Sequence, residues 1–196
     1  MTEHTREAHE ALRSIVRSLT NYPDEVDLCV VEVNGGAYWR MTVHADDQKK
    51  VVGIEGSHIK ALTYILAEMG RQNGGWVYKL KLDEPINGQR RYSTPKPTVK
   101  SYNPAKAHEL LARVVSLVTA GRVHVELDED AGEDFAYTFT LVPRTSPDHH
   151  ALTDARECTH RQTVIGALGT LWRAYAQRDG VRFTLQIRPS LFHVEH

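Results

Sequence analysis

The chain has 196 residues, of which 41% are hydrophobic and 25% are charged, and its formal net charge at pH 7 is −1. A chain of this length and apolar content can bury the core of one large domain or of two small ones. The near-neutral charge excludes a protein that coats nucleic acid by bulk electrostatics, because that mode needs many phosphate-neutralising cations. Any nucleic-acid binding is therefore expected to be local.

Neither a membrane protein nor a disulfide-rich protein is indicated. No stretch approaches the roughly 20 apolar residues of a membrane span, and the first residues, MTEHTREAHE, are too polar for a secretory signal. We therefore expect a cytoplasmic protein without membrane contact. Cys29 and Cys158 lie far apart and lack CxxC spacing, which favours two buried thiols over a disulfide framework or a zinc site.

The first 84 residues carry the patterns of six elements in the order α-β-β-α-α-β. Apolar residues at helical spacing predict a helix over 5–19. The alternating residues around Asn34-Gly35-Gly36 predict a hairpin of two strands. The remaining elements are a short helix over 46–52, a glycine-bounded break at 53–56, a helix with a buried stripe from Ile59 to Met69, and a strand over 76–82.

The same order recurs in the second half of the chain. IKALTYIL at 59–66 aligns with IGALGTLW at 165–172, and YKLKL at 78–82 aligns with FTLQI at 183–187. Such self-similarity indicates a duplicated unit. The predicted fold class is α+β, with two tandem α-β-β-α-α-β units, each a three-stranded sheet covered by helices.

A basic, proline-containing stretch separates the two units. It holds no acidic residue between Pro85 and Ala107, and its prolines and polar residues lack periodicity. Stretches of this kind rarely pack into a core, so a linker is favoured over one continuous mixed domain. We predict a first domain at 1–84, a linker at 85–106, a second domain at 107–190 and a tail at 191–196.

The stretch VHADDQKKVVGIEGSHIKAL at 43–62 resembles the signature of type II KH domains, especially of small bacterial proteins that consist of little besides one such domain. In that family a short helix ends in a lysine and two β-branched residues, and a GxxG turn and a second helix follow. The resemblance covers about the first 84 residues. It implies the fold given above, binding of single-stranded RNA, and a role in RNA regulation or ribosome-related processes.

Physical chemistry supports a phosphate-binding turn at Gly53-Ile54-Glu55-Gly56 independently of the resemblance. Glycines let a sugar–phosphate backbone approach closely, and the start of the next helix offers free N–H groups and a positive dipole end. Glu55 should repel phosphates at short range, so we expect modest affinity. The predicted nucleic-acid-binding residues are Lys49, Lys50, Gly53, Ile54, Glu55, Gly56, Ser57, His58 and Lys60.

The expected ligand is single-stranded RNA, with single-stranded DNA as a second possibility. Aromatic residues and cations together hold single strands, so Arg90, Arg91, Tyr92 and Lys96 of the linker form a candidate auxiliary surface. A solvated tether is the equally open alternative. No catalytic residue, metal site or cofactor is expected, because neither Asp148-His149-His150 nor the pair Cys158 and His160 matches a known ligand or triad spacing.

The second unit is expected to be a degenerate KH-like domain. Its stretch at 156–162 has no glycine pair before the helix, although Arg156, His160 and Arg161 could still contact RNA. The alternative is that residues 107–190 serve packing, a homodimer or a protein partner. The acidic second half and Glu55 favour this runner-up, in which the whole protein is an interaction scaffold that no longer binds RNA.

Overall fold

A computed structural model describes residues 1–83, 103–128, 136–153, 163–178 and 181–188. The chain divides into two compact units, Met1–Ser101 and Tyr102–His196, and each is described by itself. Within the described residues each unit holds three α-helices and one three-stranded sheet, so the protein is α+β as predicted. No helix in these ranges is long and apolar enough to cross a membrane.

The first unit follows the predicted order closely. Its elements are α1 (Glu3–Leu19), β1 (Asp27–Val33), β2 (Gly36–Thr42), α2 (Ala45–Val52), α3 (Ser57–Gln72) and β3 (Val77–Leu82), with short 3₁₀ helices at Pro23–Glu25 and Ile54–Gly56. The predicted bounds are correct to within a few residues. The positive φ of Gly35 (75°) explains the tight turn between β1 and β2, because left-handed backbone costs glycine little.

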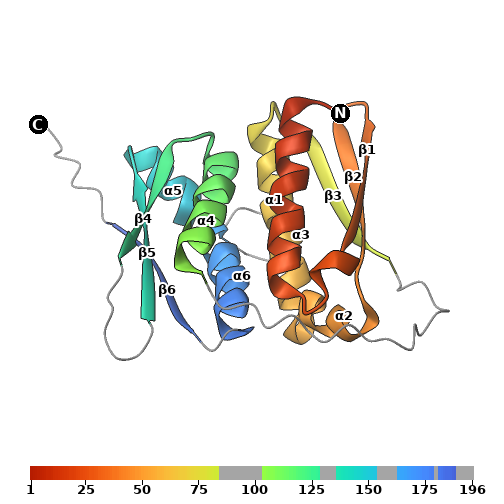
Figure 1. Ribbon diagram of the computed structural model, residues 1–196. Coiled ribbons are helices and arrows are strands. Elements are labelled where there is room, and N and C mark those ends of the chain that lie inside the picture. The colour runs from red at the N-terminus through yellow and green to blue at the C-terminus, as the bar shows by residue number, and fades with distance from the viewer. Residues whose placement is uncertain (84–102, 129–135, 154–162, 179–180, 189–196) are drawn as a thin grey trace, which may run out of the picture. The chain divides into compact units, whose positions relative to one another are not determined.

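The sheet of the first unit has the order β1-β2-β3, with β2 in the centre. The strands β1 and β2 pair antiparallel, whereas β2 and β3 pair parallel from Gly36 opposite Val77 to Met41 opposite Leu82. Parallel neighbours need a crossover connection. Here α2, the glycine turn and α3 form that crossover, and Figure 1 shows α1 and α3 on the same face of the sheet.

The core lies between this sheet face and the helices. Trp39 of β2 is completely buried and its ring meets that of Tyr78 edge-on, with the centroids 4.7 Å apart. Gly70 lets α3 approach β3, because a Cβ there would lie 2.4 Å from the carbonyl oxygen of Trp76. Trp39 is therefore a core residue. Trp76 is only half-buried, since it precedes the first residue of β3.

The N-terminus of α1 is bound to β1 through Glu32. The Thr2 backbone N–H donates to Glu32 Oε1 at 2.6 Å, while the Thr2 hydroxyl caps the helix by accepting from the Thr5 N–H. The Thr2 N–H is the main cause of a lowered pKa of the Glu32 carboxyl, which falls to about 2, and the Thr5 hydroxyl and the N-terminal ammonium act in the same direction. This contact joins two elements that the sequence patterns treat separately.

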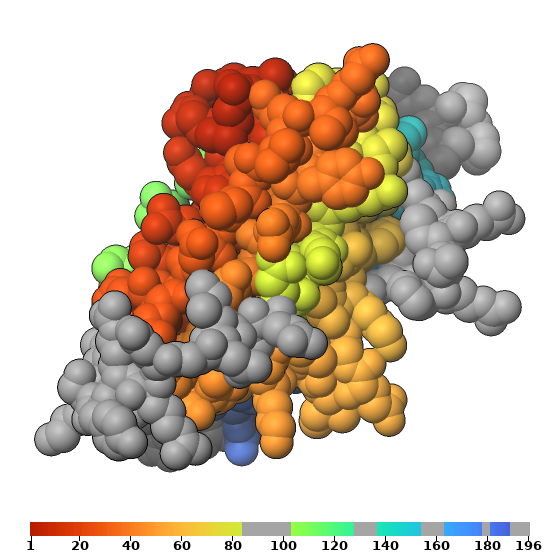
Figure 2. Space-filling view, turned by 90° about the vertical axis from the view of Figure 1, so that its right-hand side faces the viewer, coloured from red at the N-terminus to blue at the C-terminus, as the bar shows by residue number. Residues whose placement is uncertain are grey.

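The opposite face of the first sheet is open, and Figure 2 looks onto it. Side chains at alternate strand positions are exposed, including Val31, Val33, Tyr38 and Val77. Cys29 also lies on this face and is exposed, so the prediction of a buried thiol is wrong. The reason is register, because Cys29 is one residue out of phase with the buried Leu28. Cys158 lies outside the described residues.

The second unit repeats the topology of the first. Its elements are α4 (Pro104–Thr119), β4 (Val123–Asp128), β5 (Ala136–Pro143), α5 (Ser146–Thr153), α6 (Val164–Arg178) and β6 (Arg182–Ile187). The strands β4 and β5 pair antiparallel, and β5 and β6 pair parallel. The helix α4 begins at Pro104, so the last residues of the stretch predicted as a linker are helical. Most of that stretch lies outside the described residues.

The predicted order includes a helix before α6, but the sequence analysis assigns no residues to it, and the structure places this helix, α5, at Ser146–Thr153. Asp148 is buried in this helix and accepts a hydrogen bond from the Thr145 hydroxyl at 2.6 Å, and Arg122 lies 3.3 Å from its other oxygen. The carboxylate therefore anchors the start of α5. With α5 in place, both units have the order α-β-β-α-α-β.

Candidate nucleic-acid interface

The glycine turn of the first unit begins where α2 ends. Gly53 is the C-cap residue of α2, with φ 74° and ψ 174°, and its N–H donates to the Lys49 carbonyl at 2.9 Å. Lys49 and Lys50 lie in the last helical turn, where cations complement the negative end of the helix dipole. The chain therefore leaves α2 with basic side chains beside the turn.

Three of the four turn residues have positive φ. Gly53 and Gly56 have φ of 74° and 77°, and Glu55 between them has φ 53° and ψ 24°. A left-handed conformation costs a residue with a Cβ roughly 1–2 kcal/mol. The Gly56 N–H donates back to the Gly53 carbonyl at 3.2 Å and closes the turn. This backbone shape is what the two glycines at these positions make possible.

Gly53 also makes room for the helix that follows. A Cβ on Gly53 would lie 2.6 Å from Cγ of His58 and 2.8 Å from the hydroxyl oxygen of Ser57. The His58 ring is fixed in turn, because its Nδ1 lies 2.6 Å from the Lys50 carbonyl. A carbonyl only accepts, so Nδ1 carries the proton. The ring therefore links the end of α2 to the start of α3.

The cations around the turn differ in how they are held. The Lys60 ammonium donates to the Glu55 carbonyl at 2.9 Å, and the Lys50 ammonium lies 3.8 Å from the buried Asp47 carboxylate. Lys49 is exposed and forms no ion pair with any residue that the structure describes. Lys60 thus supports the left-handed Glu55 backbone, whereas Lys49 is the cation with greatest freedom to meet a ligand.

The tip of the turn points to solvent. Ile54 is 86% exposed, which is unusual for a large aliphatic side chain, and Glu55 is exposed beside it. Gly56 is the N-cap of α3, and no side chain of the described residues caps that helix. The Ser57 N–H donates to the Ile54 carbonyl, and the N–H groups that follow it lie at the positive end of the helix dipole, where an anion is favoured.

The structure brings nine of the predicted site residues together around this one turn, namely Lys49, Lys50, Gly53, Ile54, Glu55, Gly56, Ser57, His58 and Lys60. The auxiliary residues Arg90, Arg91, Tyr92 and Lys96 lie outside the described residues, and so does the stretch 156–162 of the second unit. Among the residues described, no group of three or more His, Cys, Asp or Glu side chains could hold a metal ion.

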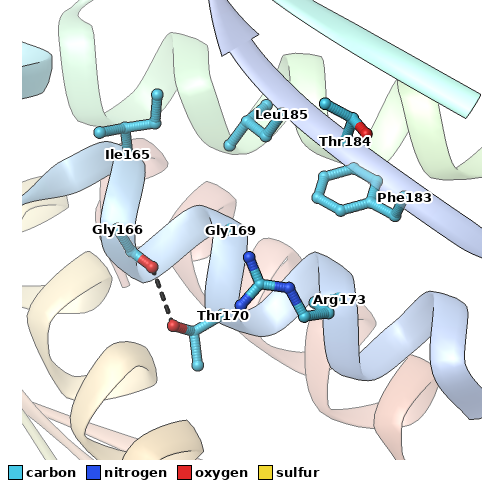
Figure 3. Close-up of a pocket in the computed structure, with 8 residues that line it drawn as sticks. All are labelled: Ile165, Gly166, Gly169, Thr170, Arg173, Phe183, Thr184 and Leu185. Carbon is cyan, nitrogen blue, oxygen red and sulfur yellow. Dashed lines mark hydrogen bonds between the residues drawn. The ribbon is translucent and has the colours of Figure 1, made fainter.

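Sequence reasoning missed a hollow in the second unit, between α6 and β6. It is lined in part by Gly166 and Gly169, which lie one helical turn apart inside α6. Glycine is unfavourable in helix interiors. The two glycines within the apolar pattern IGALGTLW were therefore the feature of the sequence that could have indicated this hollow (Figure 3). The sequence alignment with IKALTYIL used only the shared apolar positions.

The two helices joined by a Gly-x-x-Gly turn, inserted between the parallel strands β2 and β3, define the first unit as KH-like. The RNA-binding protein KhpA of Oceanobacillus iheyensis is 36% identical to this chain over 55 residues, which are 28% of the chain and 73% of the relative. The chain belongs to the family of KhpA. No protein-family model matches the chain, and no solved structure matches it.

Proposed function

We propose that this protein binds single-stranded RNA through the turn from Gly53 to Gly56 of a type II KH domain in its first unit. The likeness to KhpA, which is named as an RNA-binding protein, supports the ligand class. The second unit, with the same element order, is a degenerate KH-like domain in this proposal. RNA regulation or a ribosome-related process is the role that the family resemblance implies.

The observation that carries the proposal is the backbone shape of the turn. With φ positive at Gly53, Glu55 and Gly56, the backbone is exposed at the tip, and the uncapped N-terminus of α3 follows at once. Phosphate oxygens can accept hydrogen bonds from backbone N–H groups at a helix N-terminus. Gly53 and Gly56 have no side chains, so the sugar–phosphate chain can approach the backbone closely. Lys49 adds a local positive charge.

The direct test is a titration of the full chain with a random pool of short single-stranded RNA, compared with the double variant Ile54→Asp and Glu55→Asp. Asp tolerates the left-handed conformation, so the fold should persist. The added carboxylate at the tip should weaken binding by about fivefold or more, since unit charges about 4 Å apart in water interact by about 1 kcal/mol.

The matched control is Glu7→Asp on α1, which repeats the Glu-to-Asp change on a helix away from the turn. It should leave RNA affinity unchanged. Equal affinities for the parent protein and the double variant, with both folded by circular dichroism, would place the RNA site elsewhere. If the folded parent protein binds no RNA at low salt, the proposed function is wrong. The alternative, an interaction scaffold that does not bind RNA, would then be favoured.

A further inference from the structure

The open face of the first sheet carries a surface that the RNA-binding proposal does not use. Residues two apart along a strand share a face, and strand pairing places those of β1, β2 and β3 in rows across the sheet. The rows are Val33, Gly36 and Val77, then Val31, Tyr38 and Lys79, then Cys29, Arg40 and Lys81. We call the residues of these three rows the sheet surface. Figure 2 looks onto it, with β1 and β2 in orange and β3 in yellow-green.

One end of the sheet surface is apolar and exposed. Val31 and Val77 are 57% and 56% exposed, and Val33 and Tyr38 are 43% and 45% exposed. These four are among the six large hydrophobic side chains that are exposed in the described part of the chain. Threonine suits an exposed strand position as well as valine does, so strand formation does not require the valines. Single exposed apolar side chains are ordinary, but a group of them on one face indicates an interaction site.

The other end of the sheet surface is basic. The Lys79 ammonium lies 5.5 Å from the centroid of the Tyr38 ring and forms no ion pair with the residues that the structure describes. Arg40 and Lys81 lie 2.8 Å and 3.5 Å from the two carboxylate oxygens of Asp83, so one carboxylate serves two cations. None of the three rows contains an acidic residue. The surface therefore has a net positive charge beside its valines.

A second copy of the same surface does not complement this pattern. If two copies packed face to face about an axis along the strands, Arg40 would meet its counterpart and Lys79 would lie against Val31. If the axis ran along the middle row, Lys79 would meet its counterpart and Val77 would lie against Lys81. Like charges that are desolvated against each other oppose association. The occupant must therefore differ from the surface itself.

Two other occupants are opposed by charge and by composition. The stretch that follows β3 carries Arg90, Arg91, Lys96 and Lys100 without an acidic residue between Pro85 and Ala107, so the basic surface repels it. A single strand of RNA binds where aromatic rings and cations alternate. The sheet surface offers one ring, that of Tyr38, with Lys79 already over it, and three valines that present nothing to a phosphate.

From this arrangement we propose that the sheet surface docks an acidic amphipathic helix of another protein. The apolar side chains of that helix cover the valines and Tyr38, and its carboxylates pair with Lys79, Lys81 and Arg40. A helix is the expected form, because α1 and α3 already pack in this way on the opposite face of the sheet (Figure 1). The surface contains no residue of the Gly53–Gly56 turn, so the inference is independent of RNA binding.

The test uses the folded full chain as bait for a display library of random peptides of about 16 residues, a little over four helical turns. Peptides that also bind the double variant Val31→Thr and Val77→Thr are removed. This variant keeps the shape and the β-propensity of both side chains, so the fold should persist. The remaining peptides are synthesised and titrated into the parent protein, with binding followed by amide chemical shifts.

The expected peptides combine Asp or Glu with Leu, Ile or Phe at helical spacing, and shift the amides of Val31, Tyr38 and Val77. The double Thr variant should weaken their binding by about tenfold or more, since burying one methyl contributes about fourfold. Lys79→Gln should weaken binding severalfold and lower its salt dependence. Lys106→Gln, an exposed lysine on α4, is the matched control and should change neither.

Four results would overturn the proposal. A library that yields no acidic apolar peptide, or peptides that bind the parent protein and the double Thr variant equally, would show that the surface docks no such helix. Shifts at Val31, Tyr38 and Val77 on addition of single-stranded RNA would identify a nucleic-acid surface instead. Self-association by sedimentation that the double Thr variant abolishes would identify a second copy. RNA affinity at the turn is titrated separately, so either inference can fail without the other.

Discussion

At the scale of single residues, Glu55 shows where sequence reasoning succeeds and where it stops. The glycine pattern was sufficient to predict the turn and the side chains around it. It gave no indication that Glu55 itself is left-handed, with φ 53°, or that Lys60 donates to its carbonyl. Lys60 was predicted as a phosphate-binding cation, yet it also supports the backbone. Hydrogen bonds between a side chain and a nearby carbonyl depend on turn geometry, which residue types alone do not specify.

The strain at Glu55 leads to a prediction about stability and affinity together. Glu55→Asn should raise the free energy of unfolding by up to about 1 kcal/mol, because Asn adopts the left-handed conformation more readily. It should also tighten RNA binding severalfold by removing a carboxylate from the tip. Chemical denaturation and RNA titration of the same preparation check both effects. A variant that is less stable than the parent would show that the Glu55 side chain has a stabilising contact in solution.

The role of Lys49 is tested by the salt dependence of binding. Lys49→Ala should lower the slope of log affinity against log salt by about 0.7, the value for one phosphate contact on a single strand. Titrations at several salt concentrations measure this slope. Arg13→Ala, on α1, is the control and should leave the slope unchanged. An unchanged slope for Lys49→Ala would mean that this ammonium does not contact phosphate.

At the scale of elements, the spacing of apolar residues predicts helices and strands that bury many residues on one face. It fails for elements that bury only one or two. The segment FTLQI, aligned at 183–187 by the repeat, lies within the strand Arg182–Ile187, whose alternation runs unbroken. Helix α5 was missed because its eight residues, SPDHHALT, bury only Asp148 and Leu152. One leucine cannot establish a helical period. The prediction that Cys29 is buried was wrong for a different reason. Its strand has apolar residues on both faces, so the sequence does not show which face packs against the core.

The exposure of Cys29 predicts rapid reaction with a thiol reagent in the native protein. A Cys158→Ser background removes the other thiol, so that one equivalent of reagent should react without denaturant. A buried thiol would react only after unfolding. Absorbance of the released thiolate against time measures the rate, and a rate that rises sharply in denaturant would contradict the open sheet face seen in Figure 2.

The contact between α1 and β1 predicts a specific dependence of stability on pH. The pKa of Glu32 is lowered to about 2 in the folded protein, mainly by the Thr2 N–H. A lowered folded pKa contributes stability that is complete above the unfolded value of about 4.5 and is lost as the pH falls toward about 2. Glu32→Gln should therefore lose less stability than the parent protein between pH 5 and pH 2.5, measured by urea denaturation. Parallel losses would show that the contact does not persist.

At the scale of the whole molecule, the repeat was visible in sequence because both units bury the same positions of the same elements. The chain divides into two compact units, Met1–Ser101 and Tyr102–His196, and the domain bounds of 1–84 and 107–190 stay a prediction. The sequence indicated that the second unit lacks the glycine pair of the turn, because the stretch at 156–162 contains none. It did not indicate the hollow between α6 and β6.

The domain prediction can be tested with a fragment. Residues 1–101 alone should unfold in one cooperative transition, because the core around Trp39 lies within that unit. The fragment should keep the RNA affinity that we propose for the turn. Urea denaturation followed by tryptophan fluorescence measures the transition. A broad, non-cooperative curve would mean that the first unit needs the second for its stability.

The parallel pairing of β2 with β3 has a consequence for how the chain folds. Because α2, the glycine turn and α3 form the connection between these strands, β3 cannot reach its place until the chain has reversed at Gly53–Gly56. The residues that we propose to bind RNA are therefore also the residues whose turn must form before the sheet is complete. Substitutions in this turn should alter the refolding rate even where the folded structure is unchanged. A change in the turn can therefore affect both the rate of folding and the binding of RNA.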